Sequence, residues 1–71
     1  MTVFETALVG ATQGAGLRGA DAERHALDVL SETGLGPKAN VRAGALTLLE
    51  RKRLELARAL AARPKLLLLD E

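Results

Sequence analysis

Two adjacent carboxylates, Asp70 and Glu71, follow a run of four leucines, Leu66 to Leu69, at the end of the 71-residue sequence. Four apolar residues match the length of a buried β-strand and are too few for a helix. A strand would fix both carboxylates at its end, where hard oxygen ligands suit Mg²⁺ and a held carboxylate can act as a general base. The carboxylate pair alone is equally consistent with a buried strand that is followed by polar residues without a function. The preceding sequence therefore has to distinguish these two interpretations.

A long helix is predicted before the leucines. Thr47 and Glu50 have the Thr-x-x-Glu spacing of a capping box, and no Pro or Gly interrupts the sequence from there to Pro64. Helical spacing predicts an apolar stripe of Leu49, Leu56 and Leu60 with Ala57 and Ala61. On the outer surface Glu55 is expected to pair with Arg51 and Arg58, each pair contributing about 0.2–0.5 kcal/mol.

A short amphipathic helix is predicted at the N-terminus. Thr2 and Glu5 repeat the capping-box spacing, and Phe4 and Leu8 fall on one face. Gly14 to Gly19 then match the dinucleotide-binding pattern G-x-G-x-x-G, but a helix precedes them and that pattern requires a strand. We therefore interpret this glycine-rich stretch as a connection.

A second helix is predicted after this connection, with Asp21 as its N-cap. Ala26, Leu27 and Leu30 are expected to face inward. Gly34 is expected to end the helix in a left-handed conformation, with Leu35 folded back onto Leu30. His25 lies among charged residues with no other His and no Cys in the chain, so it is expected to be a solvated surface residue.

Composition limits the class of protein. The length allows one small domain, and the absence of cysteine excludes disulfides and cysteine-based metal sites. Apolar residues make up 48% of the chain but are mostly Ala and Leu, so the core is expected to be thin. A net charge of +1 produces no strong electrostatic field that would attract nucleic acid or membranes. The N-terminus has no basic region typical of a secretory signal, so a cytoplasmic location is expected.

The order of long basic helix, Pro64-Lys65, leucine run and Asp70-Glu71 resembles the ABC transporter ATPases, from their signature motif L-S-G-G-Q to the end of the Walker B strand. Leu46 and Thr47 stand where that motif has L-S, and "ARAL" falls in its usual place. The opening "TVFETALVGA" is similar to the sequence that follows the family's Q-loop. The wording "RLELARAL" looks most like the ATP-binding subunits of branched-chain amino acid importers.

The resemblance implies a mainly α chain that is a fragment of a P-loop NTPase α/β domain, with a helical subdomain, a long signature helix and one terminal β-strand. Residues 1–45 would form part of the helical subdomain, and residues 46–71 the signature helix and Walker B strand. The cofactors implied are ATP and Mg²⁺, with Asp70 holding the metal through water and Glu71 polarising the water that attacks the γ-phosphate.

The resemblance also places Thr47, Leu48, Leu49 and Glu50 where the signature motif faces the γ-phosphate of ATP bound to a second subunit. Thr47 keeps the motif's hydroxyl. Leu48 and Leu49 replace two glycines, at an expected cost of about 1–2 kcal/mol wherever a left-handed conformation is needed, and Glu50 replaces a neutral glutamine. Either the subfamily tolerates these changes, or this signature serves a weak site in a mixed dimer.

The partners implied are a second ATP-binding subunit and transmembrane permease subunits at the inner face of the cell membrane, with no nucleic acid. No P-loop pattern G-x-x-x-x-G-K-[ST] occurs in the sequence, so the chain alone is expected not to hydrolyse ATP. Its unpaired leucine strand is expected to make the isolated chain self-associate.

An alternative from another class is a small helical binding module that uses the basic helix on nucleic acid or another acidic partner. The residues concerned are Arg51, Lys52, Arg53, Arg58, Arg63 and Lys65. Glu50 and Glu55 interrupt this surface and it carries no aromatic residue for base stacking, so the ATPase interpretation is favoured.

Overall fold

The computed structural model describes residues 1–63. Its α-helices are α1 (Val3–Val9), α2 (Gly19–Glu32) and α3 (Leu48–Ala61). A π-helical segment, η1 (Gly10–Gly14), continues α1, and two 3₁₀ turns connect α2 to α3, η2 (Gly36–Lys38) and η3 (Ala43–Ala45). The predicted mainly α class is confirmed, while the predicted strand at Leu66 to Leu69 lies outside the described residues.

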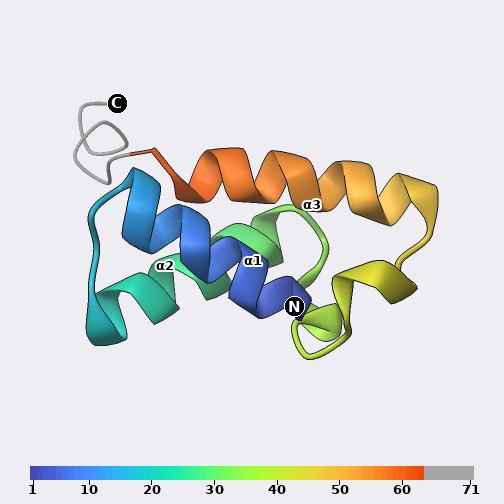
Figure 1. Cartoon of the computed structure of the whole chain (residues 1–71), viewed down its shortest axis with the longest axis horizontal. Helices are drawn as coiled ribbons and strands as arrows, with labels where there is room; N and C mark the ends of the chain where they lie inside the picture. The colour runs from blue at the N-terminus through green and yellow to red at the C-terminus, as the bar shows by residue number, and fades with distance from the viewer. Residues whose placement is uncertain (64–71) are drawn as a thin grey trace.

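The three helices pack against one another, and α3 runs along one side of α1 and α2 (Figure 1). α1 and α3 run in the same direction, and α2 runs in the opposite one (Figure 1). This arrangement brings η1, at the end of α1, against the last turns of α3.

The predicted capping box at the start of α1 is confirmed. Glu5 N–H donates to Thr2 Oγ1 at 3.1 Å, and Thr2 N–H donates to Glu5 Oε1 at 2.7 Å. The adjacent Val3 N–H donates to the carbonyl of Val41 at 2.8 Å. Orphan N–H groups of the helix end are thus satisfied, and α1 is tied to the loop that leads to α3.

The predicted stop of α2 is also confirmed. Gly34 has a φ of 79°, and its N–H donates to the Ser31 carbonyl at 3.2 Å. Leu35 N–H donates to the Leu30 carbonyl at 2.8 Å, and both leucine side chains are fully buried. These two bonds define a Schellman motif, in which glycine is favoured because a side chain would strain the left-handed residue.

The predicted N-cap of α2 is wrong. The helix begins at Gly19, with Arg18 as an N-cap that makes no side-chain hydrogen bond. Asp21 lies inside the first turn, where its carboxylate favourably meets the positive end of the helix dipole. The glycine-rich connection is confirmed in part, since Gly16 and Gly19 adopt positive φ whereas Gly14 belongs to η1.

Small residues dominate the core, because the helices approach one another closely. Among residues 1–63 the buried apolar residues are Val3, Ala7, Ala11, Ala22, Ala26, Val29, Leu30, Leu35, Leu46, Leu54, Ala57 and Ala61. Phe4 and Leu8 pack against this core but are only partly buried.

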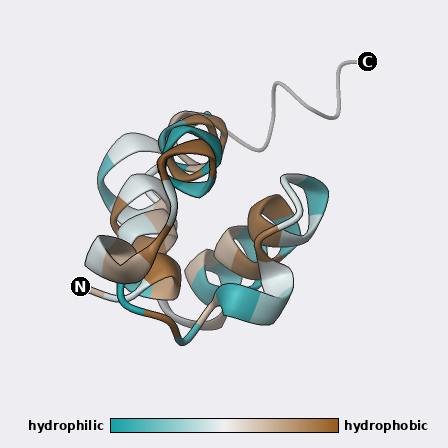
Figure 2. Ribbon diagram, turned by 90° about the vertical axis from the view of Figure 1, so that its right-hand side faces the viewer, coloured by the Kyte–Doolittle hydropathy of each residue, from teal (hydrophilic) through white to brown (hydrophobic). Residues whose placement is uncertain are grey.

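Several leucines predicted to face inward are exposed instead. Leu49 and Leu56 of α3 are 61% and 55% exposed, and Leu27 of α2 is 48% exposed. Ala57 and Ala61 are buried and Leu60 packs against the core as predicted, but Leu54 takes the inward position expected of Leu49 and Leu56. Figure 2 accordingly shows hydrophobic and hydrophilic residues alternating around α3.

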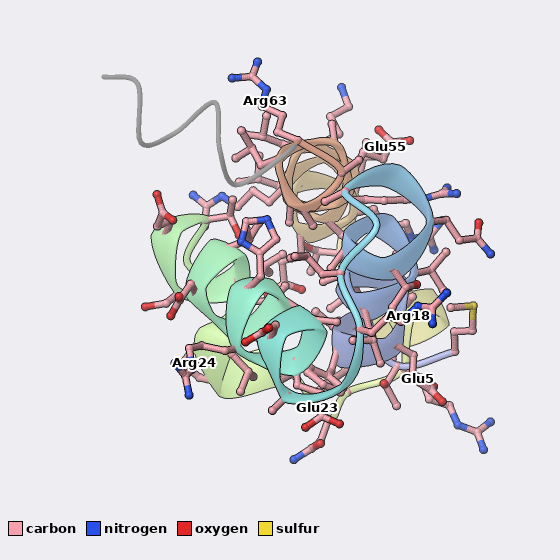
Figure 3. All side chains as sticks on the ribbon, turned by 90° about the vertical axis from the view of Figure 1, so that its left-hand side faces the viewer. Glu5, Arg18, Glu23, Arg24, Glu55 and Arg63 are labelled. Carbon is pink, nitrogen blue, oxygen red and sulfur yellow. The ribbon has the colours of Figure 1, made fainter. Side chains whose placement is uncertain are left out.

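The prediction of a surface position for His25 is wrong, since its side chain is only 4% exposed. It lies three residues after Ala22 and four before Val29, on the inward stripe of α2. Its neighbours Glu23 and Arg24 project outward (Figure 3). The buried His25 Nε2 has no hydrogen-bond partner among the described residues.

The predicted ion pairs of Glu55 are also wrong. Within residues 1–63 neither Arg51 nor Arg58 lies within 4.0 Å of the Glu55 carboxylate, and the ion pair present there joins Lys38 and Glu50. Exposed ion pairs on one helix contribute little to the free energy of folding. The side-chain rotamers of Glu55, Arg51 and Arg58 can therefore be determined by other neighbouring groups.

The contact between η1 and α3 requires glycine at position 14. A Cβ added to Gly14 would lie 2.3 Å from the Cβ of Ala62 and 2.7 Å from its Cα. We expect Gly14→Ala to destabilise the fold by about 1–3 kcal/mol, because the backbones would have to separate. Gly44→Ala is the matched control, since nothing lies within 4 Å of its added Cβ. Equal thermal unfolding midpoints for the two variants would contradict this packing.

Candidate functional site

The N-terminus of α3 is built by the second predicted capping box, which is confirmed. Glu50 N–H donates to Thr47 Oγ1 at 3.2 Å, and Thr47 N–H donates to Glu50 Oε1 at 2.9 Å. Thr47 has the extended φ and ψ of an N-cap, −67° and 167°. Its hydroxyl accepts one hydrogen bond in this arrangement, and its own proton remains available to a ligand.

Leu48 and Leu49 occupy the first two positions of this helix. Their side chains are 70% and 61% exposed. All positive φ values in the described part of the chain belong to glycines, so neither leucine carries the left-handed strain expected from replacing glycine. Their backbone N–H groups have no hydrogen-bond partner among residues 1–63. Two free amides at the positive end of a helix dipole suit an anion.

Glu50 is held from two sides. Besides the Thr47 N–H, its carboxylate contacts the Lys38 ammonium at the end of η2, with Oε2 as the acceptor. The hydrogen bond from Lys38, followed by that from the Thr47 backbone, lowers the pKa of Glu50 to about 2. The side chains of Lys38 and Glu50 are 45% and 20% exposed, so this contact is partly open to solvent. Sequence reasoning missed Lys38, because no spacing rule relates residues 12 apart in separate elements.

The predicted residues Thr47, Leu48, Leu49 and Glu50 therefore lie together in one helix turn. Asp70 and Glu71 lie outside the described residues, so the structure does not test their predicted roles. Residues 1–63 contain no group of three or more His, Asp or Glu side chains that would hold a metal ion. No helix in that range is long and apolar enough to cross a membrane.

An open groove of about 550 Å³ lies elsewhere, between the end of α1 with η1 and the C-terminal half of α3. Its lining residues are Val9, Gly10, Gln13, Gly14, Glu55, Arg58, Ala59 and Ala62. Arg51 and Arg58 line a second groove beside Glu55 and Leu54. Both arginines belong to the basic surface of the alternative interpretation, and in this groove they lie beside one acidic and one apolar residue of α3.

A family model described as "ABC transporter" matches residues 1–71. The chain belongs to the ABC transporter family. Two curated ABC relatives are both named aliphatic sulfonates import ATP-binding protein SsuB 1. That from Pseudomonas fluorescens is 48% identical over 56 residues, covering 79% of this chain and 22% of the relative. That from Mesorhizobium japonicum is 43% identical over 53 residues, covering 75% and 20%.

The chain thus spans about a fifth of the length of these ABC relatives. No solved structure shows significant similarity to it. The predicted ABC family is confirmed. The relatives are named for sulfonate import, so they do not support the predicted likeness to branched-chain amino acid importers.

Proposed function

We propose that this chain forms part of the ATP-binding subunit of an ABC importer. Residues 1–45 contribute to the helical subdomain, and residues 46–71 supply the signature helix and the Walker B strand. The observation that carries the proposal is the N-terminus of α3, where two free backbone N–H groups adjoin the Thr47 hydroxyl in a chain of this family.

In this proposal the N-terminus of α3 meets the γ-phosphate of ATP held mainly by a second ATP-binding subunit. The N–H groups of Leu48 and Leu49 and the hydroxyl of Thr47 donate to phosphate oxygens. These donors are fixed by the helix and its capping box, so little reorganisation is needed as negative charge builds up during phosphoryl transfer.

Asp70 and Glu71 complete the chemistry at the subunit's own nucleotide. Mg²⁺ neutralises phosphate charge when bound with ATP. Asp70 would help to hold that metal through water, and Glu71 would orient the attacking water molecule and accept its proton. The support for these roles is the order of the leucine run and the carboxylate pair behind the α3 helix.

The complete assembly would pair two ATP-binding subunits with permease subunits at the cytoplasmic face of the membrane. The names of the two relatives favour an aliphatic sulfonate as the imported substrate. Both are called ATP-binding proteins, which agrees with ATP as the nucleotide.

A chimeric subunit tests the proposal: residues 1–71 replace the matching segment of the Pseudomonas fluorescens relative. We expect Thr47→Ala to lower kcat for ATP hydrolysis by about tenfold to a hundredfold, because a hydrogen bond to charged phosphate is lost. Thr47→Ser keeps both the cap and the donor and should retain activity. Thr12→Ala is the matched control, since the Thr12 hydroxyl bonds only to nearby carbonyls of its own helix. Parental kcat in Thr47→Ala would overturn the proposed role of the α3 N-terminus.

A further inference from the structure

The contact between Lys38 and Glu50 puts a cation beside the carboxylate at the proposed phosphate-facing end of α3. Glu50 Oε1 accepts the Thr47 N–H at 2.9 Å, and Oε2 contacts the Lys38 ammonium. Lys38 belongs to η2, so two separate elements hold one carboxylate. Within residues 1–63 this is the ion pair that the fold makes.

A carboxylate at this place is a problem for an anion site, because it repels phosphate in the same turn whose amides attract it. One uncompensated unit charge close to a polyphosphate changes its affinity by about tenfold. The low pKa of Glu50 means that the carboxylate is ionised at neutral pH. The site therefore needs a compensating cation.

Lys38 is placed to be that cation, and the nearest arginines of α3 are not. Arg53 is directed toward the end of α2, where its Nη1 would lie 3.6 Å from a Cβ on Gly34. Arg51 lines the groove with Thr6 and Leu54. Neither lies within 4.0 Å of the Glu50 carboxylate.

We propose that Lys38 is a positioning residue for the α3 N-terminus, which cancels the charge of Glu50 and so allows that helix end to accept an anionic phosphate group. The inference rests on the proposed function, because it takes the phosphate to be the γ-phosphate of ATP. It adds a residue from η2, outside the signature stretch, to the determinants of nucleotide affinity.

Charge compensation and a purely structural ion pair predict different effects of the variants on ATP affinity. If the pair only stabilised the fold, Lys38→Met and Glu50→Gln would break the same contact and would shift ATP affinity in the same direction. If Lys38 cancels charge, the two variants move the net charge of the site in opposite directions, and the double variant restores it.

The first measurement uses the 71-residue chain and follows the Glu50 carboxyl carbon by NMR during a pH titration. Lys38→Met should raise the pKa of Glu50 from about 2 by about 1 or more, because the donor that lowers it most is lost. Lys52→Met is the matched control: Lys52 is exposed on α3 and makes no ion pair within the described part of the chain. Equal pKa values for Glu50 in the parent and in Lys38→Met would overturn the proposal.

The second measurement is the KM for MgATP in the chimeric subunit and its variants. Lys38→Met should raise KM about tenfold and Glu50→Gln should lower it about tenfold. The double variant should lie within about twofold of the parent, as should Lys52→Met, whose exposed charge is screened by solvent and salt.

These measurements distinguish a failure of the proposed role of Lys38 from a failure of the proposed function. Shifts of KM in the same direction, or no shift, in subunits that still hydrolyse ATP would overturn the role of Lys38 and leave the proposed function standing. Absence of ATP binding and hydrolysis in all folded variants would overturn the proposed function, and the inference with it. Opposite shifts that cancel in the double variant would support both.

Discussion

Glu71→Gln in the chimeric subunit is expected to lower the rate of ATP hydrolysis by about 10² to 10⁴-fold. Glutamine keeps the size and the hydrogen-bonding capacity of the side chain but cannot accept a proton from the attacking water. A general base acts mainly in the transition state, so the Kd for MgATP should change little. The measurement pairs steady-state hydrolysis with equilibrium binding of ATP.

Glu23→Gln is the matched control for this result. Glu23 projects outward from α2 (Figure 3), so its neutralisation should leave both hydrolysis and binding unchanged. Asp70→Asn should increase the Mg²⁺ concentration needed for half-maximal hydrolysis, because one charged oxygen near the metal is lost. If Glu71→Gln hydrolyses ATP at the parental rate, the general-base role of Glu71 is wrong.

Leu30→Ala is expected to unfold the 71-residue chain or come close to doing so. Leu30 is fully buried, and truncating such a leucine costs about 2–5 kcal/mol through lost burial and the cavity left behind. A core of this size supplies only about 3–5 kcal/mol in total. Circular dichroism should therefore show loss of most helical signal, or a thermal midpoint lowered by at least about 8 °C.

Leu27→Ala provides the control on the same helix. Leu27 is 48% exposed, so its truncation should change the free energy of unfolding by no more than about 0.5 kcal/mol. Similar losses for the two variants would mean that α2 presents a different face to α1 and α3.

Local signals in the sequence predicted the helix ends well. Both capping boxes and the Schellman motif at Gly34 involve residues at most five apart, so their side-chain and backbone partners can be read directly from spacing. The start of α2 was missed because Arg18 and Gly19 form it without a capping side chain.

The inward faces of the helices could not be predicted from side-chain size alone. A Cβ on Gly10 would lie 2.7 Å from the Arg58 carbonyl oxygen, so η1 and the last turns of α3 are too close for large side chains between them. Ala57 and Ala61 therefore take the inner positions near the end of α3, Leu54 takes the inner position before them, and Leu49 and Leu56 are turned outward. For His25, its spacing from Ala22 and Val29 was a usable signal, which its charged neighbours obscured.

The candidate site likewise contains residues that could be predicted from their spacing in the sequence and one residue that could not. Thr47 and Glu50 were predicted as a pair because one helix turn contains both. Lys38 was not predicted, because its contact with Glu50 depends on where the fold places η2 relative to the start of α3. Contacts between elements are decided by tertiary packing, which a single sequence does not specify position by position.

A crystal structure of the chimeric subunit carrying Glu71→Gln, with MgATP bound, would show directly whether the N-terminus of α3 contacts the γ-phosphate. We expect a dimer in which the Leu48 and Leu49 amide nitrogens of one subunit lie about 2.7–3.2 Å from γ-phosphate oxygens of the ATP on the other. A γ-phosphate that contacts neither amide, in a subunit with ATP bound, would contradict the claim that the N-terminus of α3 is its recognition element.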